Sequence, residues 1–103
     1  MYIHAFAFQW IAGVTEEQIQ QARQKILALQ GQIPGLLETH VGTNISERGR
    51  GNVFGGVMKF TDKAALEAYF PHPVHQALGE WLMPLIVPTE LDFEADSSAK
   101  PFK

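Results

Sequence analysis

The stretch Tyr2-Ile3-His4-Ala5-Phe6-Ala7-Phe8-Gln9 decides the fold, because the strand it predicts has no polar face. Alternation puts aromatic side chains and a histidine on one face and smaller apolar side chains on the other. The first face holds His4, Phe6 and Phe8, and the second holds Ile3, Ala5 and Ala7. A strand that is apolar on both sides lies inside a sheet, so we expect helices over one face and a second layer over the other.

A long helix is predicted after this strand. Its start is marked by a capping box, Thr15-Glu16-Glu17-Gln18, whose first and last side chains satisfy each other's backbone N–H groups. Apolar side chains then recur at spacings of three and four until Pro34-Gly35 ends the run. This stripe, which we expect to pack on the sheet, consists of Ile19, Ala22, Ile26, Leu29 and Ile33.

Two further strands are predicted at residues 36–43 and 53–60, separated by a polar loop. The loop covers residues 44–52 and contains glycines, and we expect the two strands to pair as neighbours. The glycine pair Gly55-Gly56 indicates a bulge or a close approach by another group.

Two short helices and a last strand complete the pattern. Asp62 can cap a first helix that runs through Phe70, and Pro73 suits the first turn of a second helix that runs to about Leu85. Residues 87–94 then alternate apolar and polar side chains, which predicts a strand with one acidic face.

The order strand, helix, strand, strand, helix pair, strand predicts an α+β fold of the ferredoxin-like βαββαβ type. Its four-stranded antiparallel sheet would carry all helices on one face. We place this domain at residues 1–95 and interpret residues 96–103 as a polar C-terminal tail. The uncovered sheet face would expose more apolar surface than a small monomer tolerates, so we predict a homodimer formed face to face between two sheets.

Composition argues against several classes of partner. The net charge is -3 with only 8 Lys and Arg residues, so no basic surface is available for nucleic acid. No apolar run approaches the roughly 18 residues of a membrane span, so we expect no membrane partner. The chain contains no cysteine, which removes disulfides, thiolate metal ligands and a cysteine nucleophile from consideration. We expect a cytoplasmic protein.

A candidate site lies at the predicted helix join, Tyr69-Phe70-Pro71-His72-Pro73-Val74-His75. The ordinary pKa of imidazole, about 6.5, lies near neutrality, so two histidines beside a phenol can form an acid–base cluster. Two imidazoles on one helical turn, together with His4, could also supply three metal ligands. The segment contains no acidic residue and a proline separates its histidines, which argues against a metal.

This segment, the opening strand and the element Gly42-Thr43-Asn44-Ile45-Ser46 together resemble the stress-responsive A/B barrel (Dabb) family. The resemblance covers roughly residues 2–95 and implies a dimeric α/β barrel in which two sheets pack together. The family includes plant stress-induced proteins without an established reaction. It also includes olivetolic acid cyclase, which closes a linear polyketide by aldol condensation.

The cyclase-like members of the family imply catalytic roles for three residues of this chain. By this resemblance His75 would remove a proton next to a carbonyl, Tyr69 would orient or protonate the oxyanion, and His4 would steer the substrate. Such chemistry needs no cofactor, so we expect none, and we expect a small apolar or carbonyl-bearing ligand. The pocket would lie between sheet and helices, lined further by His72, Phe6, Phe8 and Trp81.

Each candidate also has a structural interpretation. A histidine at a helix start, such as His75, can cap the helix or hydrogen-bond to a strand, and Tyr69 can fill core space. His4 can be a neutral core histidine, and His72 a linker residue beside proline. The alternative function is therefore a non-catalytic stress-responsive or structural dimer, whose pocket is filled by its own side chains.

Overall fold

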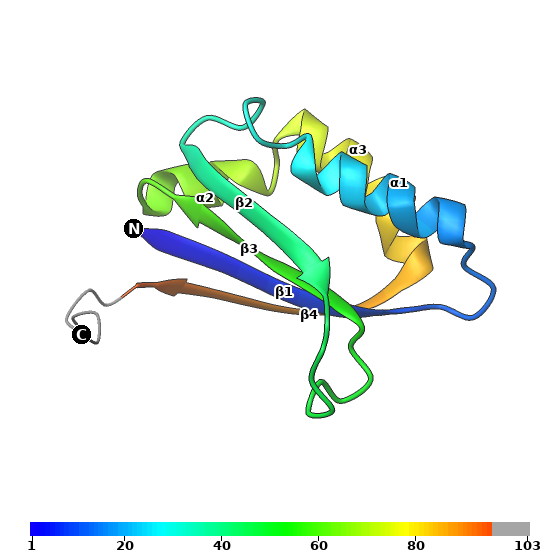
Figure 1. The fold of residues 1–103 in the computed structure, drawn as a ribbon. Helices are drawn as coiled ribbons and strands as arrows, with labels where there is room; N and C mark the ends of the chain where they lie inside the picture. The colour runs from blue at the N-terminus through cyan, green and yellow to red at the C-terminus, as the bar shows by residue number, and fades with distance from the viewer. Residues whose placement is uncertain (96–103) are drawn as a thin grey trace.

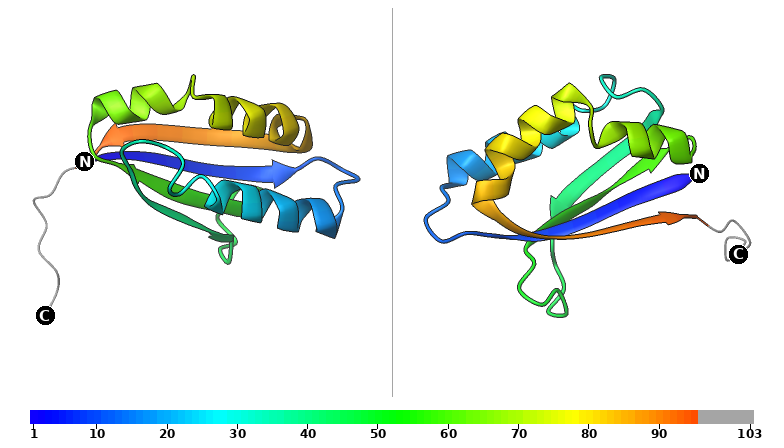
Figure 2. Two further views of the ribbon diagram at one scale, coloured as in Figure 1. Left: turned by 90° about the horizontal axis from the view of Figure 1, so that it is seen from above. Right: turned by 180° about the vertical axis from the view of Figure 1, so that it is seen from behind.

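Four antiparallel strands form one sheet, and every helix lies on the same side of it (Figures 1 and 2). The structure is a computed structural model that describes residues 1–95, so the predicted polar tail at residues 96–103 lies outside the described residues. The strands are β1 (Tyr2–Trp10), β2 (Leu36–Thr43), β3 (Phe54–Phe60) and β4 (Ile86–Glu94). The helices are α1 (Glu16–Leu27), α2 (Lys63–Tyr69), α3 (Pro73–Leu82) and the short 3₁₀ helix η1 (Met83–Leu85).

The strand order β2-β3-β1-β4 places β1 inside the sheet, as its two apolar faces predicted. Across β1 and β3, His4 pairs with Met58 and Phe8 pairs with Phe54, and these side chains face the helices. The other face carries the smaller pair Ala5 and Val57. The ferredoxin-like α+β fold is thus confirmed, and two aromatic-rich clusters fill the space between sheet and helices.

Helix α1 begins as predicted but ends earlier than predicted. The Gln18 N–H donates to Thr15 Oγ1 at 3.1 Å, and the Thr15 N–H donates to Gln18 Oε1 at 2.9 Å, which completes the capping box. Directly after Leu27 the hydrogen bonds tighten, with the Leu29 N–H donating to Ile26 O at 3.1 Å and the Gln30 N–H to Leu27 O at 3.2 Å. Gly31 then turns the chain with a φ of 88°, a left-handed conformation that an α-helix cannot contain. Leu29 and Ile33 are nevertheless buried, from the turns that follow the helix.

The later helices also follow their predicted caps. Asp62 Oδ1 accepts the Ala65 N–H at 2.8 Å at the start of α2, and α3 begins at Pro73. The prediction that α3 runs as one helix to Leu85 was wrong. Pro84 has no N–H to donate, so the chain tightens into η1 after Leu82.

The glycine pair in β3 marks a close approach, one of the two predicted alternatives. A Cβ atom on Gly55 would lie 2.7 Å from the Phe6 carbonyl oxygen, and one on Gly56 would collide with the His40 carbonyl oxygen. The irregular register of the sheet lies elsewhere, between Leu36 and Glu38 of β2.

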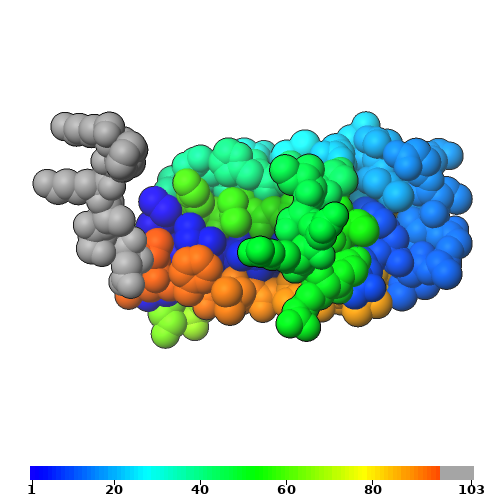
Figure 3. Space-filling model, turned by 60° about the horizontal axis from the view of Figure 1, so that its bottom comes forward, coloured from blue at the N-terminus to red at the C-terminus, as the bar shows by residue number. Residues whose placement is uncertain are grey.

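No helix of residues 1–95 lies on the lower face of the sheet, which Figure 3 views from below. Strand β4 turns its acidic side chains toward the helices and its apolar side chains toward this open face. The exposed apolar side chains that β4 places there are Val87, Leu91 and Phe93. Within residues 1–95 no helix is long and apolar enough to cross a membrane.

Candidate functional site

A small cavity of about 60 Å³ lies between the sheet and the helices, and four side chains that can transfer protons border it. His4 comes from β1, Tyr69 from the end of α2, His75 from the first turn of α3 and Glu90 from β4. The rings of Tyr69 and His75 lie 4.3 Å apart between centroids, and those of His4 and Tyr69 lie 5.9 Å apart. The fold thus brings together the three residues that the resemblance implied, from three separate elements.

His75 is oriented by the helix join. Its Nδ1 lies 2.9 Å from the carbonyl oxygen of Phe70, which closes α2. Because a carbonyl oxygen only accepts, Nδ1 carries the proton in this contact, and the neutral ring keeps its lone pair on Nε2. His75 can therefore accept a proton at Nε2 without losing the bond that orients it.

Tyr69 is buried and stays a neutral phenol. Burial is the main cause that raises the pKa of its hydroxyl far above the ordinary value, and the negative charges of Glu90 and Asp92 raise it further. Within residues 1–95 no hydrogen bond joins this hydroxyl to a side chain or to the backbone. Because no fully buried side-chain oxygen there lacks a partner, the hydroxyl retains some accessible surface. It is thus a proton donor available to a molecule in the cavity.

His4 is held by two carboxylates of the neighbouring strand. Only 3% of this residue is exposed, yet its Nδ1 donates to Asp92 Oδ1 at 2.6 Å and its Nε2 lies 3.5 Å from Glu90 Oε1. The rings of Phe6 and Phe70 flank the imidazole with centroids 5.8 and 5.6 Å away. A buried imidazole in this apolar setting needs such partners, and the carboxylates also fix the direction of its ring.

Asp92 and Glu90 were not among the site residues predicted from the sequence. The alternation in the last strand correctly predicted one acidic face, but alternation alone does not tell which face meets the helices. The antiparallel register that pairs His4 with Asp92 and Phe6 with Glu90 decides this. A predicted pairing of the first and last strands, with His4 on the helix side, would have been the signal that finds them.

Of the four further residues predicted to line the pocket, two border the cavity and two do not. Phe6 and Phe8 line the cavity. His72 is instead the N-cap of α3, where its Nδ1 accepts the Val74 N–H at 3.1 Å, and Trp81 lies under the Lys25 ammonium group at 5.2 Å. Neither His72 nor Trp81 borders the cavity.

Comparison with known families identifies the fold and matches the site segments. The model of the stress responsive A/B barrel domain matches residues 3–95, which is nearly the whole chain and includes His4, Tyr69 and His75. The chain belongs to this family. A comparison with curated proteins gives no match.

Several solved structures have the same fold as this chain. A protein of Arabidopsis thaliana is 19% identical with a TM-score of 0.88, covering 97% of this chain and 100% of its own. A dimeric ferredoxin-like protein of unknown function from Jannaschia is 28% identical with a TM-score of 0.80, covering 91% and 98%. The hydroxynitrile lyase of Passiflora edulis is 17% identical with a TM-score of 0.85, covering 96% and 97%.

No metal site is formed in the part of this A/B barrel domain that the structure describes. Within residues 1–95 no three side chains of His, Asp or Glu are grouped to hold an ion. The two histidines of the helix join are occupied separately, because His72 caps α3 and His75 binds the Phe70 carbonyl.

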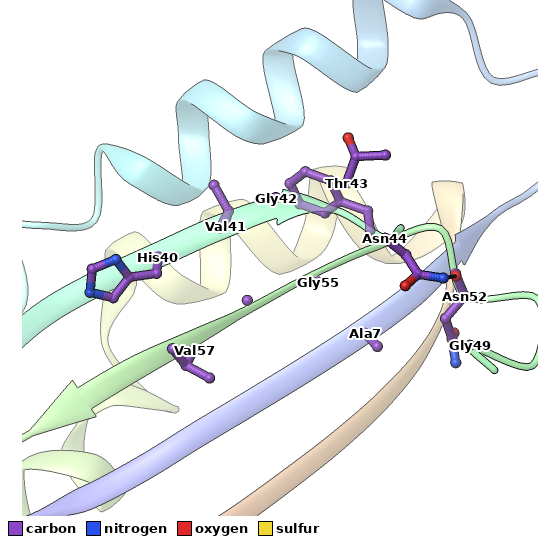
Figure 4. A pocket seen from close by; sticks show the side chains of 12 residues that line it. Ala7, His40, Val41, Gly42, Thr43, Asn44, Gly49, Asn52, Gly55 and Val57 are labelled. Carbon is purple, nitrogen blue, oxygen red and sulfur yellow. Dashed lines mark hydrogen bonds between the residues drawn. The ribbon is translucent and has the colours of Figure 1, made fainter. Parts of the chain in front are cut away.

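A second, larger hollow lies on the open face of the A/B barrel sheet, beneath the loop of residues 44–53 (Figure 4). Its volume is about 460 Å³, but it is shallow and wide open. Small residues form its floor, with Ala7 and Gly55 at the centre, and the single titratable side chain among its lining residues is His40. His40 is bound to Glu38 at 2.8 Å. The smaller cavity therefore holds the chemistry, although the open hollow has the greater volume.

Proposed function

We propose that this protein binds a small carbonyl-bearing molecule in the cavity between sheet and helices and moves protons on it without a cofactor. One observation carries the proposal, namely that an oriented imidazole and a neutral, unpaired phenol border the same cavity. His75 offers a lone pair at Nε2 and Tyr69 offers an O–H, with ring centroids 4.3 Å apart. A base and a donor that border the same cavity can act on the two ends of one carbonyl unit.

The proposed step is proton abstraction next to a carbonyl. Nε2 of His75 takes a proton from the ligand, and the electron pair of the broken bond moves onto the carbonyl oxygen. The Tyr69 hydroxyl donates a hydrogen bond or its proton to that oxygen, which stabilises the new charge. His4 is held by Asp92, and its ring centroid lies 5.9 Å from that of Tyr69; in this proposal it orients the ligand. The sequence of events describes either a cyclase-like or a lyase-like reaction.

The relation to a lyase supports this proposal. The hydroxynitrile lyase of Passiflora edulis has the same fold over 96% of this chain. Its name shows that a protein of this architecture can act as a lyase on a small molecule. Because the two chains are only 17% identical, we take the reaction type as the shared feature and leave the substrate of our chain open.

We also propose that the protein is a homodimer whose sheets pack face to face, as the sequence predicted. The exposed side chains of Val87, Leu91 and Phe93 on the open face support this assembly, because a partner sheet would remove them from water. The Jannaschia relative is described as dimeric, which is further support. A cytoplasmic location stays a prediction from the sequence.

The alternative is a non-catalytic stress-responsive or structural dimer. Its support is the size of the cavity, which at about 60 Å³ is far below the 300 Å³ or more of ordinary ligand pockets. Phe8 and Leu82 are both buried and both border it. In this alternative the open face is the functional surface and the buried histidines maintain the architecture.

Deuterium exchange tests the proposal without knowledge of the natural substrate. Acetone in D₂O exchanges its methyl protons when a base abstracts them, and acetone cyanohydrin releases cyanide when a base takes its hydroxyl proton. We expect the protein to accelerate one of the two reactions, and His75→Gln or Tyr69→Phe to lower the rate about 100-fold or more. His40→Gln, a histidine on the opposite sheet face, is the matched control and should keep the full rate. If wild type and His75→Gln are equally inactive in both assays, the non-catalytic dimer is the better account.

A further inference from the structure

We propose that the cavity selects its ligand by charge, accepting neutral or cationic small molecules and rejecting anions. This inference rests on the proposed function and names the ligand class of the same site. Its basis is the distribution of charged side chains around the cavity. Glu90 is the single ionisable acid among the lining residues, and none of the lining residues that the structure describes is a lysine or an arginine.

Two carboxylates stand on one side of the cavity. Glu90 is 44% exposed at the side chain and borders the cavity, while Asp92 lies two residues further along the same face of β4. Both contact the imidazole of His4, at 3.5 and 2.6 Å. A protonated His4 would neutralise only one of these two charges. The carboxylate side of the cavity therefore keeps a negative charge in either protonation state of His4.

The two cations of α1 that lie closest in sequence to the buried residues of that helix are directed elsewhere, and Lys63 of α2 borders a different pocket, together with Asp92. The Arg23 guanidinium lies over the ring of Phe54 at 5.1 Å, and the Lys25 ammonium lies over the ring of Trp81 at 5.2 Å. Lys59 points to the open face of the sheet, where it pairs with Glu38 at 3.6 Å. An anion that entered the cavity would thus lose water and find no lysine or arginine among the lining residues, which is costly in a partly buried site.

The negative charges of Glu90 and Asp92 also act on the phenol of Tyr69. The charges of Glu90 and Asp92 add to burial in raising the pKa of Tyr69, so both carboxylates act on the centre of the proposed site. A ligand anion placed beside the Tyr69 hydroxyl would meet the same repulsion as a phenolate. A neutral carbonyl oxygen can accept the hydroxyl hydrogen bond without that repulsion.

The size of the cavity limits which small molecules can be used as probes of binding. A volume of about 60 Å³ corresponds to roughly two water molecules at liquid density, so the probe must be very small. Acetate, acetamide and acetamidinium have the same planar skeleton of four heavy atoms and carry charges of -1, 0 and +1. Differences in their binding therefore report the charge preference of the site and not its shape.

The experiment is an NMR titration of the whole protein with each probe at pH 8 and low salt. The signals followed are the side chains of Tyr69 and His75. We expect acetamide and acetamidinium to shift both side-chain signals, and acetate to bind at least about tenfold more weakly than acetamide. In 0.5 M salt the difference should shrink, because Glu90 is partly exposed to screening ions.

Two matched variants test whether the difference between acetate and acetamide binding depends on Glu90. Glu90→Gln removes the charge with little change of shape and should reduce the difference between acetate and acetamide several-fold. Glu94→Gln is the control, because Glu94 lies on the same face of β4 but pairs with Tyr2, outside the cavity lining. It should leave the difference as in wild type.

The outcomes separate the two proposals. Acetate binding as tightly as acetamide, or a difference that Glu90→Gln does not change, would overturn the charge selection while leaving the small-molecule site in place. Failure of all three probes to shift Tyr69 and His75 would overturn the proposed small-molecule site itself, and the charge selection with it.

Discussion

The helix-covered face of the sheet and its open face are built from the same strands but differ in which kinds of side chain they bury. On the covered face His4 is 3% exposed and needs two carboxylates to be tolerated among aromatic rings. On the open face the apolar side chain of Leu91 is 63% exposed. One face thus buries polar groups, and the other exposes apolar groups.

This difference places the candidate site and the proposed dimer interface on opposite faces of the sheet. A buried imidazole with oriented partners is a costly arrangement, and it is found here beside the cavity between sheet and helices. An exposed apolar strand is equally costly until a second surface covers it. Because the side chains of β1 and β4 alternate between the two faces, this one pair of strands contributes to both the candidate site and the proposed interface.

The largest expected effect comes from placing a charge in the middle of the open face. We expect Leu91→Lys to weaken the proposed dimer on the order of 100-fold or more, because a lysine there would lose its water or keep the partner away. Sedimentation across a range of protein concentrations measures the change. Leu27→Lys is the matched control, since Leu27 is also exposed, at 43%, but lies on α1. Equal dimerisation of the two variants would place the interface elsewhere.

A change at Asp92 tests the covered face. Asp92→Asn keeps the shape of the side chain that holds His4 but removes its charge, so we expect the His4 ring to be less firmly held. If His4 orients the ligand, the rate of the proposed reaction should fall on the order of 10- to 100-fold while the dimer persists. Exchange kinetics and sedimentation on the same sample check both statements. An unchanged rate would limit Asp92 to a structural role.

Glycine substitutions compare packing on the two faces directly. A Cβ at Gly56 would lie 2.8 Å from the Phe6 ring and collide with the His40 carbonyl, so Gly56→Ala should cost about 1–3 kcal/mol of unfolding free energy. A Cβ at Gly42, on the open face, would meet no atom within 4 Å, so Gly42→Ala should change this free energy little. Urea unfolding measures both. Similar losses would mean that the open face is as tightly filled as the covered one.

The smallest effect is a pH dependence that belongs to the covered face alone. The pKa of Tyr69 is raised in the folded protein, so its stabilising effect is complete below pH 10 and is lost as the pH rises further, because the unfolded chain ionises first. One such group accounts for at most about 1.4 kcal/mol per pH unit. Urea unfolding at pH 8 and pH 11 should therefore show a smaller loss for Tyr69→Phe than for wild type. Equal losses would show that the phenol is accessible to water.

Local signals in the chain predicted most of the fold. The capping box at Thr15 and the cap at Asp62 placed two helix starts correctly, because these side chains act on their own backbone. The helix ends were less predictable. The apolar stripe continues to Ile33 although α1 stops at Leu27, since residues in turns can also reach the core.

Part of the candidate site could be predicted in the same way. Tyr69 and His75 lie six residues apart at one helix join, so their proximity follows from local structure. His4 was added by resemblance to a family and not by geometry. Glu90 and Asp92 were placed on an acidic strand face without a role, because no local feature of the chain connects them with His4, 86 and 88 residues earlier.

The sequence by itself determined the elements, the two-sided apolar character of β1 and the open apolar face, because periodicity and caps depend on neighbours along the chain. Only the tertiary structure decided that the acidic face of β4 turns toward the helices, where it holds His4 and gives the cavity a negative side. The physical reason is strand register: a shift of one residue would turn Glu90 and Asp92 to the open face and leave His4 without a partner.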